Sequence, residues 1–165
     1  MKHIIFILLF IATNLIASDF IHLIDERFNE SVSSVANTIE FRTYTYNDNR
    51  FAVLTERDTL RFFLLSTDYS QVIGYQGTTT LGIIFNQDMT VERLEIIRSQ
   101  ETAGYIRRLN RMGFSHRFDG FRKGDEIEII TGATMTCEAM IKSVNETINI
   151  FKPIAEKYLL DFLQK

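Results

Sequence analysis

Short strand-like segments follow one another through the middle of the chain with only short turns between them. They are Phe41–Tyr46, Phe51–Leu54, Leu60–Ser66, Gln71–Tyr75, Thr78–Phe85 and Val91–Ile97. Turn residues such as Asn47-Asp48-Asn49 and Asn86-Gln87-Asp88 stand between neighbours. Because no crossover helix separates the segments, they can pair directly only as antiparallel strands.

Helical periodicity frames this region. Apolar residues at helical spacing predict one helix from about Asp25 to Glu40 and another from Thr102, its expected cap, to Met112. Gly113 is expected to end the second helix, and Glu126–Ile130 has the pattern of a further strand. A last amphipathic helix starts near Glu138; Pro153 is expected to break or kink it before a final helix. The whole pattern predicts an α+β fold with a central, mostly antiparallel sheet and flanking N- and C-terminal helices.

The N-terminus has the pattern of a secretory signal. Lys2 precedes an apolar run, Ile4–Ile16, which ends in the small residues Ala17 and Ser18. The run is shorter than the roughly 20 residues of a membrane-spanning helix. We expect residues 1–18 to be a signal peptide and 19–165 to form a single domain, in the periplasm or another extracytoplasmic space. A retained N-terminal anchor and a buried helix of a cytosolic protein are the alternatives.

Charge and cysteine content exclude several kinds of function. The formal net charge is −3 over 165 residues, which argues against a nucleic-acid partner. Cys137 is the only cysteine, so the chain has no intrachain disulfide, no covalent haem motif and no thiolate set for an iron–sulfur cluster. His22 and His116 lack the spacing of zinc ligands.

Three threonines surround a Gly-Ala pair in the stretch Thr131–Thr136, between the expected strand and the last helix. Gly132 and Ala133 leave the backbone open to close approach, and the free N–H groups of a helix start favour a phosphate. Taken alone, the stretch is more typical of an ordinary helix cap at a tight corner than of a phosphate site.

Other short motifs precede this corner. They are Gly74-Tyr75-Gln76-Gly77, Glu101-Thr102-Ala103-Gly104 and Phe118-Asp119-Gly120-Phe121. In this order, and with an amphipathic helix after the last, they resemble the FMN-binding domain over about Ile73 to Phe151. That domain occurs in peripheral subunits of sodium-pumping NADH:quinone oxidoreductase and related electron transport complexes, and in standalone exported flavoproteins.

The resemblance implies covalent FMN, joined by a phosphodiester to Thr134 by a separate exported flavin transferase that uses FAD and a divalent metal. Thr131, Gly132, Ala133 and Thr136 complete the attachment motif. Glu101, Thr102 and Gly104 match a loop that lies near the flavin ring in the family. The chain departs from the family pattern at Glu128, where Asp is usual and for which Asp125 is displaced by three residues, at Ala103 for Pro, and at Cys137 for Ser.

The expected function is therefore an exported flavoprotein that transfers electrons between redox partners, standalone or within a membrane respiratory complex, rather than a stand-alone catalyst. A non-redox binding or structural domain of the same fold and an exported flavin reductase are the alternatives. No catalytic constellation stands out, since His116 and Asp119 have no evident third group. A basic stretch is either a solvated face or a surface for acidic partners or flavin phosphates. It consists of Arg107, Arg108, Arg111, Arg117, Arg122 and Lys123. Phe62 and Phe63 are expected in the core.

Overall fold

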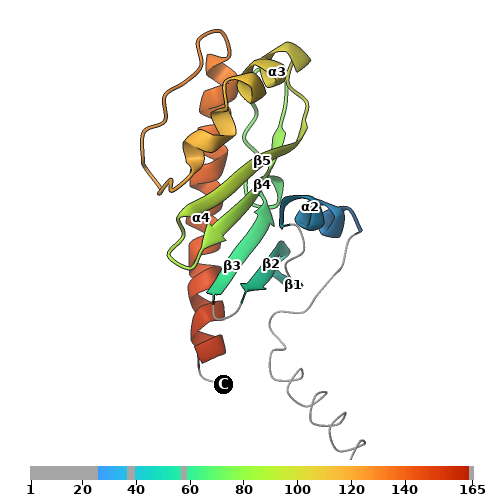
Figure 1. Ribbon diagram of the computed structural model, residues 1–165, viewed down its shortest axis with the longest axis vertical. Coiled ribbons are helices and arrows are strands. Elements are labelled where there is room, and N and C mark those ends of the chain that lie inside the picture. Colours follow the sequence, from blue (N-terminus) through green and yellow to red (C-terminus); the bar gives the residue numbers. More distant parts are fainter. Residues whose placement is uncertain (1–25, 37–39, 57–58, 164–165) are drawn as a thin grey trace, which may run out of the picture.

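The computed structural model describes residues 26–36, 40–56 and 59–163 (Figure 1). Its elements, in chain order, are α2 (Glu26–Ala36), β1 (Glu40–Tyr46), β2 (Asn49–Glu56), β3 (Thr59–Leu65), the 3-10 helix η1 (Ser66–Asp68), β4 (Thr79–Asn86), β5 (Val91–Ser99), α3 (Ala103–Arg111), the 3-10 helix η2 (Phe114–Phe118) and α4 (Thr134–Leu163). The predicted signal segment, residues 1–18, lies outside the described residues. No helix within the described ranges is both long and apolar enough to cross a membrane.

The five strands form one antiparallel sheet in the order β1-β2-β3-β4-β5. The predicted α+β fold with helices at both ends is confirmed. Asn47 and Asp48 have φ values of 47° and 65° and connect Tyr46 to its partner Asn49. This is the two-residue hairpin connection that suits the twist of antiparallel strands.

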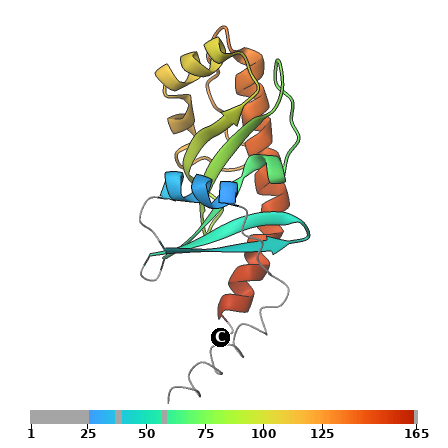
Figure 2. The same cartoon turned by 90° about the vertical axis from the view of Figure 1, so that its right-hand side faces the viewer.

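Helices cover the two faces of the sheet, α4 on one and α2 on the other (Figures 1 and 2). Phe62 packs toward α4, with its ring 5.4 Å from that of Phe151, whereas Phe63 packs toward α2, 5.7 Å from Phe28. Both strand residues are fully buried, as expected from the sequence. Apolar residues therefore alternate between two cores, which fits the period of a strand.

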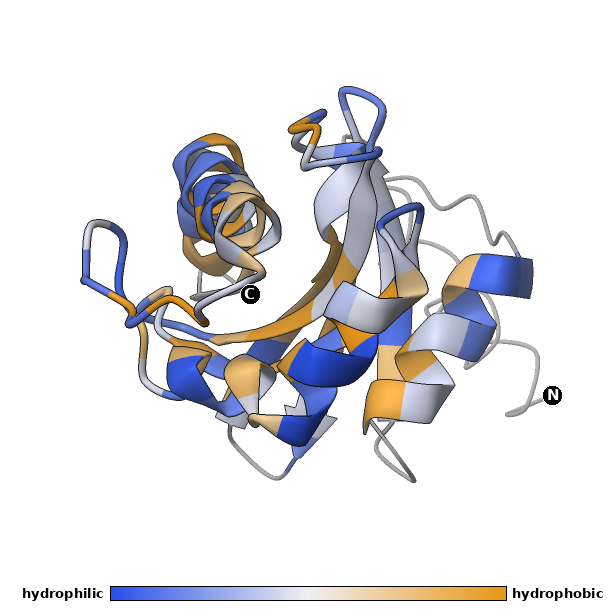
Figure 3. Cartoon of the chain, turned by 90° about the horizontal axis from the view of Figure 1, so that it is seen from above, coloured by the Kyte–Doolittle hydropathy of each residue, from blue (hydrophilic) through white to orange (hydrophobic). Residues whose placement is uncertain are grey.

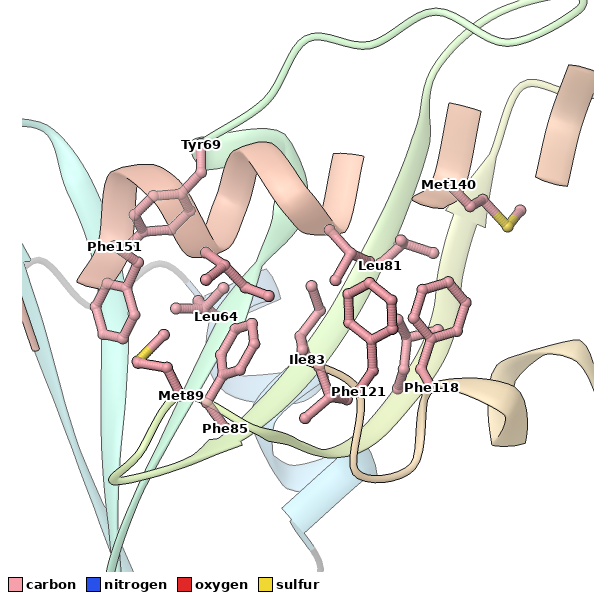
Figure 4. Packing of buried hydrophobic residues seen from close by; sticks show 14 of the residues in the cluster. Leu64, Tyr69, Leu81, Ile83, Phe85, Met89, Phe118, Phe121, Met140 and Phe151 are labelled. Carbon is pink, nitrogen blue, oxygen red and sulfur yellow. The ribbon is translucent and has the colours of Figure 1, made fainter. Parts of the chain in front are cut away.

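The larger core lies between the sheet and α4 (Figure 4). Leu64, Leu81, Ile83 and Phe85 supply its sheet side, and Phe151 belongs to α4. In the view from above, the apolar residues of the sheet, coloured orange, lie between α4 and the helices on the other side (Figure 3). Each fully buried side chain of this kind contributes about 1.5–3 kcal/mol relative to an exposed one.

Of the two effects expected of Pro153, a break or a kink, the break is wrong. α4 runs without interruption for 30 residues, with Pro153 inside it. Proline removes the hydrogen bond to the carbonyl of Asn149, four residues earlier. Because Pro153 and Asn149 are both exposed, water can satisfy that carbonyl, and the apolar side of the helix stays packed on the sheet.

Two predicted strands are not formed. Residues 71–75 make only an isolated bridge, between Ile73 and Thr78. Glu126–Ile130 is irregular, and the loop before it pairs with β5 only at the first residue of that strand: Val91 donates its N–H to the carbonyl of Phe121, and its carbonyl accepts the N–H of Gly120. Alternating apolar residues describe an extended chain, but they do not supply a free strand edge.

The described helices differ in detail from the predicted ones. The first ends at Ala36, well before Glu40, which belongs to β1. Thr102 occupies the cap position of α3, but its side chain makes no capping hydrogen bond, contrary to expectation. Gly113 ends that helix as predicted, in the left-handed conformation with φ of 63°.

Candidate functional site

The threonine-rich corner forms the first turn of α4. Ala133 is the residue that caps the helix, because its carbonyl accepts the N–H of Cys137 at 2.9 Å. Gly132 has φ of 81°, in the left-handed region where a side chain is strained. Thr134 is thus the first helical residue, where backbone N–H groups have no partner within the helix.

The three threonines of the corner face different surroundings. Thr131 is exposed, Thr134 is half-buried, and Thr136 is only 1% exposed. The Thr136 hydroxyl donates to Oε2 of Glu101 at 2.7 Å. A hydroxyl has one hydrogen, so Thr136 cannot donate to a phosphate while this bond is present. In this structure the Thr136 hydroxyl is engaged with Glu101, whereas Thr131 is exposed and Thr134 half-buried.

Glu101 turns inward from the loop after β5. It is 7% exposed, and its Oε1 accepts the N–H groups of Gln76 and Gly77 at 3.1 and 3.2 Å. With the bond from Thr136, one carboxylate joins three segments: the 74–77 turn, the loop after β5 and the first turn of α4. Sequence reasoning placed Glu101 near a flavin ring, and the structure gives it this linking role.

The glycines of the 74–77 turn allow these segments to meet. A Cβ at Gly74 would overlap Oε1 of Glu101, and one at Gly77 would lie 2.7 Å from Cβ of Gln100. Gly74 also lies against α4, because its Cβ would be 3.4 Å from that of Ala139. The Gly-Tyr-Gln-Gly motif is therefore a packing motif that brings the turn onto the helix start.

Thr102 and Gly104 lie at the start of α3. The carbonyl of Thr102 accepts the N–H groups of Tyr105 and Ile106 at 2.9 and 3.3 Å, so its backbone opens the helix. Gly104 is exposed, and a Cβ built there would meet nothing within 4 Å. The described residues thus give no steric reason for a glycine at this position.

Arg108 brings positive charge to the corner. A Cβ at Gly132 would lie 3.8 Å from both Cζ and Nη1 of Arg108, so the guanidinium sits beside the backbone that leads into Thr134. Sequence reasoning placed Arg108 in a general basic stretch and missed this contact. The available signal was helical spacing, since Arg108 follows Gly104 by one turn on the same face of α3.

Other members of the basic stretch have partners elsewhere. Arg117 donates to the carbonyl of Glu128 at 2.6 Å and to its carboxylate at 3.1 Å. Arg122 pairs with Asp88 at 3.0 Å, and Lys123 donates to Asn149 at 2.7 Å. The stretch is therefore not one continuous basic surface.

The acidic and thiol positions that depart from the family pattern are also defined. Glu128 has an exposed side chain held by Arg117, and the carboxylate of Asp125 accepts the N–H of Arg122 at 2.7 Å. Cys137 is fully buried beneath the corner, where its Sγ accepts the N–H of Ile130 at 3.4 Å. Burial raises the pKa of this thiol.

His116 and Asp119 do come together, with Nδ1 of the histidine 3.5 Å from the carboxylate. Both side chains are exposed, and the pair lines a groove between β5 and η2 that has a volume of about 580 Å³. The groove is lined by Glu92, Arg93, Leu94, Glu95, Ile96, Asn110, Gly113, Phe114, Ser115, His116 and Asp119. It does not include the threonine corner.

Comparison with known proteins adds one finding. The family model described as the FMN-binding domain matches residues 74–149. The match begins at the first glycine of the 74–77 turn and includes α3, the threonine corner and the first half of α4. No curated protein matches the chain.

Proposed function

Residues 74–149 of this chain belong to the FMN-binding domain family, and from that premise we propose that the protein carries FMN covalently on Thr134 and transfers electrons through it. The observation that carries the proposal is the position of the Thr134 hydroxyl. Thr134 is half-buried and is the first residue of α4, and the Arg108 guanidinium lies beside Gly132, two residues earlier. Of the three corner threonines, Thr134 alone combines a helix start with access to solvent.

The chemistry of the corner fits a phosphodiester. Free N–H groups and the positive end of the helix dipole stabilise a negative group at Thr134. Arg108 adds a planar donor suited to phosphate oxygens. The left-handed Gly132 lets the backbone turn sharply before the anchor. In this proposal Thr131 is the second exposed hydroxyl available to the phosphate.

Attachment is a transfer reaction catalysed by a separate flavin transferase. The Thr134 oxygen bonds to the phosphorus on the FMN side of FAD, the pyrophosphate P–O bond breaks, and AMP leaves. The threonine hydroxyl loses its proton, and the protein gains the mass of FMN less one water. No electron is exchanged in this step.

Bound FMN supplies an acceptor and donor of one or two electrons. The protein anchors it and sets its surroundings. In the described part of the chain, the polar groups placed at the corner are Arg108, beside Gly132, and the buried Glu101 carboxylate, bonded to Thr136. We therefore propose an electron carrier, exported by the N-terminal segment, that works with protein redox partners, alone or within a membrane electron transport complex.

Intact mass spectrometry tests the attachment. The protein is co-expressed with an exported flavin transferase, beside the variants Thr134→Ala and Thr131→Ala. We expect a gain of FMN less one water in the wild type and in Thr131→Ala, and none in Thr134→Ala. An unmodified wild type, beside a transferase that modifies a known substrate, would overturn the covalent proposal and favour a non-redox domain.

The redox role needs a separate measurement on the modified protein. We expect chemically reduced flavin on the protein to be reoxidised by a protein or dye acceptor in one round. Sustained consumption of a small-molecule acceptor without a partner protein would instead favour an exported flavin reductase.

A further inference from the structure

The outer edge of β5 carries backbone groups with which a further strand could pair. β5 pairs with β4 on one side. In the described part of the chain, its other side is hydrogen-bonded to backbone only at Val91, through Gly120 and Phe121. Because an interior strand is bonded along both edges, the N–H and C=O groups of this edge after Val91 are open to water or to a partner.

The regular part of this edge is short. Register shifts interrupt the β4–β5 pairing on both sides of Leu81–Ile84, whose partners on β5 are Arg93–Ile96. Such irregularities twist an edge and limit how far another strand can follow it. The edge therefore suits a short extended segment better than the nine-residue β5 strand of a second copy.

A groove accompanies the regular stretch. It is the groove of about 580 Å³ between β5 and η2, and Arg93–Ile96 are among its lining residues. Leu94 on β5 and Phe114 on η2 are buried and belong to the core on the α4 side of the sheet. Since the side chains of a strand alternate between two faces, every second residue of an added strand would lie on the side of Leu94 and Phe114. Apolar residues fit these positions.

The charge of the groove is negative. Its lining contains three carboxylates, those of Glu92, Glu95 and Asp119, and one arginine, Arg93. Arg93 pairs with Glu95, and Arg61 pairs with Glu92 at 2.8 Å, but the two glutamate side chains are still 37% and 36% exposed. The side chain of Asp119 is 53% exposed. The excess of accessible carboxylates favours a basic partner.

We propose that the outer edge of β5 binds a short, extended segment of a partner protein in which basic and apolar residues alternate. In strand addition of this kind, main-chain hydrogen bonds supply affinity and alternate side chains supply specificity. Here the main chain would pair along Arg93–Ile96, apolar residues would pack toward Leu94 and Phe114, and basic residues would bind Glu95 and Asp119. The inference goes beyond the electron-carrier role, and the segment does not occupy the threonine corner.

Peptide binding tests the proposal. The probe is a short, terminally blocked peptide of alternating lysine and valine, titrated into the purified full-length protein without attached FMN. Nuclear magnetic resonance follows the backbone amide signals of the protein. We expect the largest shifts at Arg93–Ile96 and in η2. Shifts confined to the Thr131–Thr136 corner would overturn the proposal.

Two control peptides separate the contributions to binding. In one, glutamate replaces every lysine, which reverses the charge. In the other, the central residues of the lysine–valine peptide are N-methylated, which removes the N–H groups that a strand ladder needs. We expect both to bind several-fold more weakly than the probe. Equal binding by either control would contradict the proposed mode.

Matched variants locate the site. Glu95→Gln/Asp119→Asn removes two carboxylates of the groove, and Glu126→Gln/Glu138→Gln removes two exposed carboxylates elsewhere. We expect roughly threefold to tenfold weaker binding of the probe by the first double variant and unchanged binding by the second. Equal weakening in both would indicate a general charge effect and overturn the assignment to the groove.

Two further results would also contradict the proposal. One is a wild-type protein that does not bind the probe. The other is a wild-type dimer that the probe dissociates, because a second copy would then occupy the β5 edge. Neither result bears on attachment of FMN to Thr134, which intact mass tests separately.

Discussion

The hydroxyl of Thr136 donates to the buried carboxylate of Glu101 at 2.7 Å and so fixes the first turn of α4 to the loop after β5. Two backbone N–H groups from the 74–77 turn bind the other oxygen of the same carboxylate. The corner that holds Thr134 is therefore positioned by a side chain two residues away and not by the anchor itself.

Thr136→Val is expected to destabilise the protein. The substitution keeps the shape but leaves one buried carboxylate oxygen without its donor, which costs about 1–3 kcal/mol. Thr147→Val is the matched control on the same helix, because the Thr147 hydroxyl is also buried but donates to a helix carbonyl, that of Ser143. The Thr147→Val variant should therefore lose less free energy of unfolding than Thr136→Val. Urea unfolding of both variants measures the difference, and equal losses would contradict the linking role of Glu101.

Arg108→Ala is expected to slow attachment of FMN and leave the fold unchanged. An exposed charge pair contributes about 1 kcal/mol or less, which corresponds to at most roughly fivefold in rate. Arg107→Ala, the neighbouring exposed arginine, is the control. Time courses by intact mass measure the rates at low and high salt. A slower rate in both variants would indicate a general charge effect and not a contact at the corner.

Glycine-to-alanine substitutions should act in opposite directions at two positions of the site. Gly132→Ala forces a side chain into the left-handed region and should cost about 1–2 kcal/mol. Gly104→Ala has open space and lies in a helix, so it should stabilise the apoprotein by up to about 1 kcal/mol. Thermal unfolding measures both. If Gly104→Ala also lowers the yield of attached FMN, the glycine is kept for the approach of the cofactor; destabilisation by it would contradict the open geometry.

The Cys137 thiol should make the protein lose stability in alkali. Burial raises its pKa, so the folded state holds a proton that the unfolded state releases. The stabilisation is complete below the unfolded pKa of about 8.5 and is lost, by about 1.4 kcal/mol per pH unit, as pH rises toward the folded pKa. Burial also raises the pKa values of Tyr69 and Tyr158, which adds the same sign of change above about pH 10.

Urea unfolding at a series of pH values checks this expectation. Cys137→Ala should flatten the decline between about pH 8.5 and 10, before the tyrosines contribute. A thiol reagent should modify the wild type in urea but hardly at all when folded. Fast modification of the folded protein would show that the thiol is accessible.

The sheet could be predicted because each strand alternates between two apolar faces and short turns left only antiparallel pairing. Phe62 and Phe63 are an example. They are adjacent in sequence but pack on opposite faces of the sheet, Phe62 against Phe151 and Phe63 against Phe28.

Other features depended on contacts that spacing does not encode. Glu126–Ile130 alternates like a strand but pairs with none, and the loop before it meets β5 only at Val91, through Gly120 and Phe121. Pro153 does not end α4, since packing of the apolar side outweighs one lost hydrogen bond at an exposed carbonyl. For Glu101, the sequence indicated the loop but not the inward direction of the carboxylate, because its three donors come from two other segments.

The segment that matches the family model is smaller than the part of the chain that forms the sheet. The family match spans residues 74–149 and therefore contains only two of the five strands, β4 and β5. Cut out alone, that segment would leave the β3 side of β4 unpaired from Gly82 to Asn86 and would remove Phe51 and Phe62 from the core. A two-stranded sheet is marginal in water, and an open apolar edge invites association. The matched segment therefore depends for its folding on strands outside it, which close that edge.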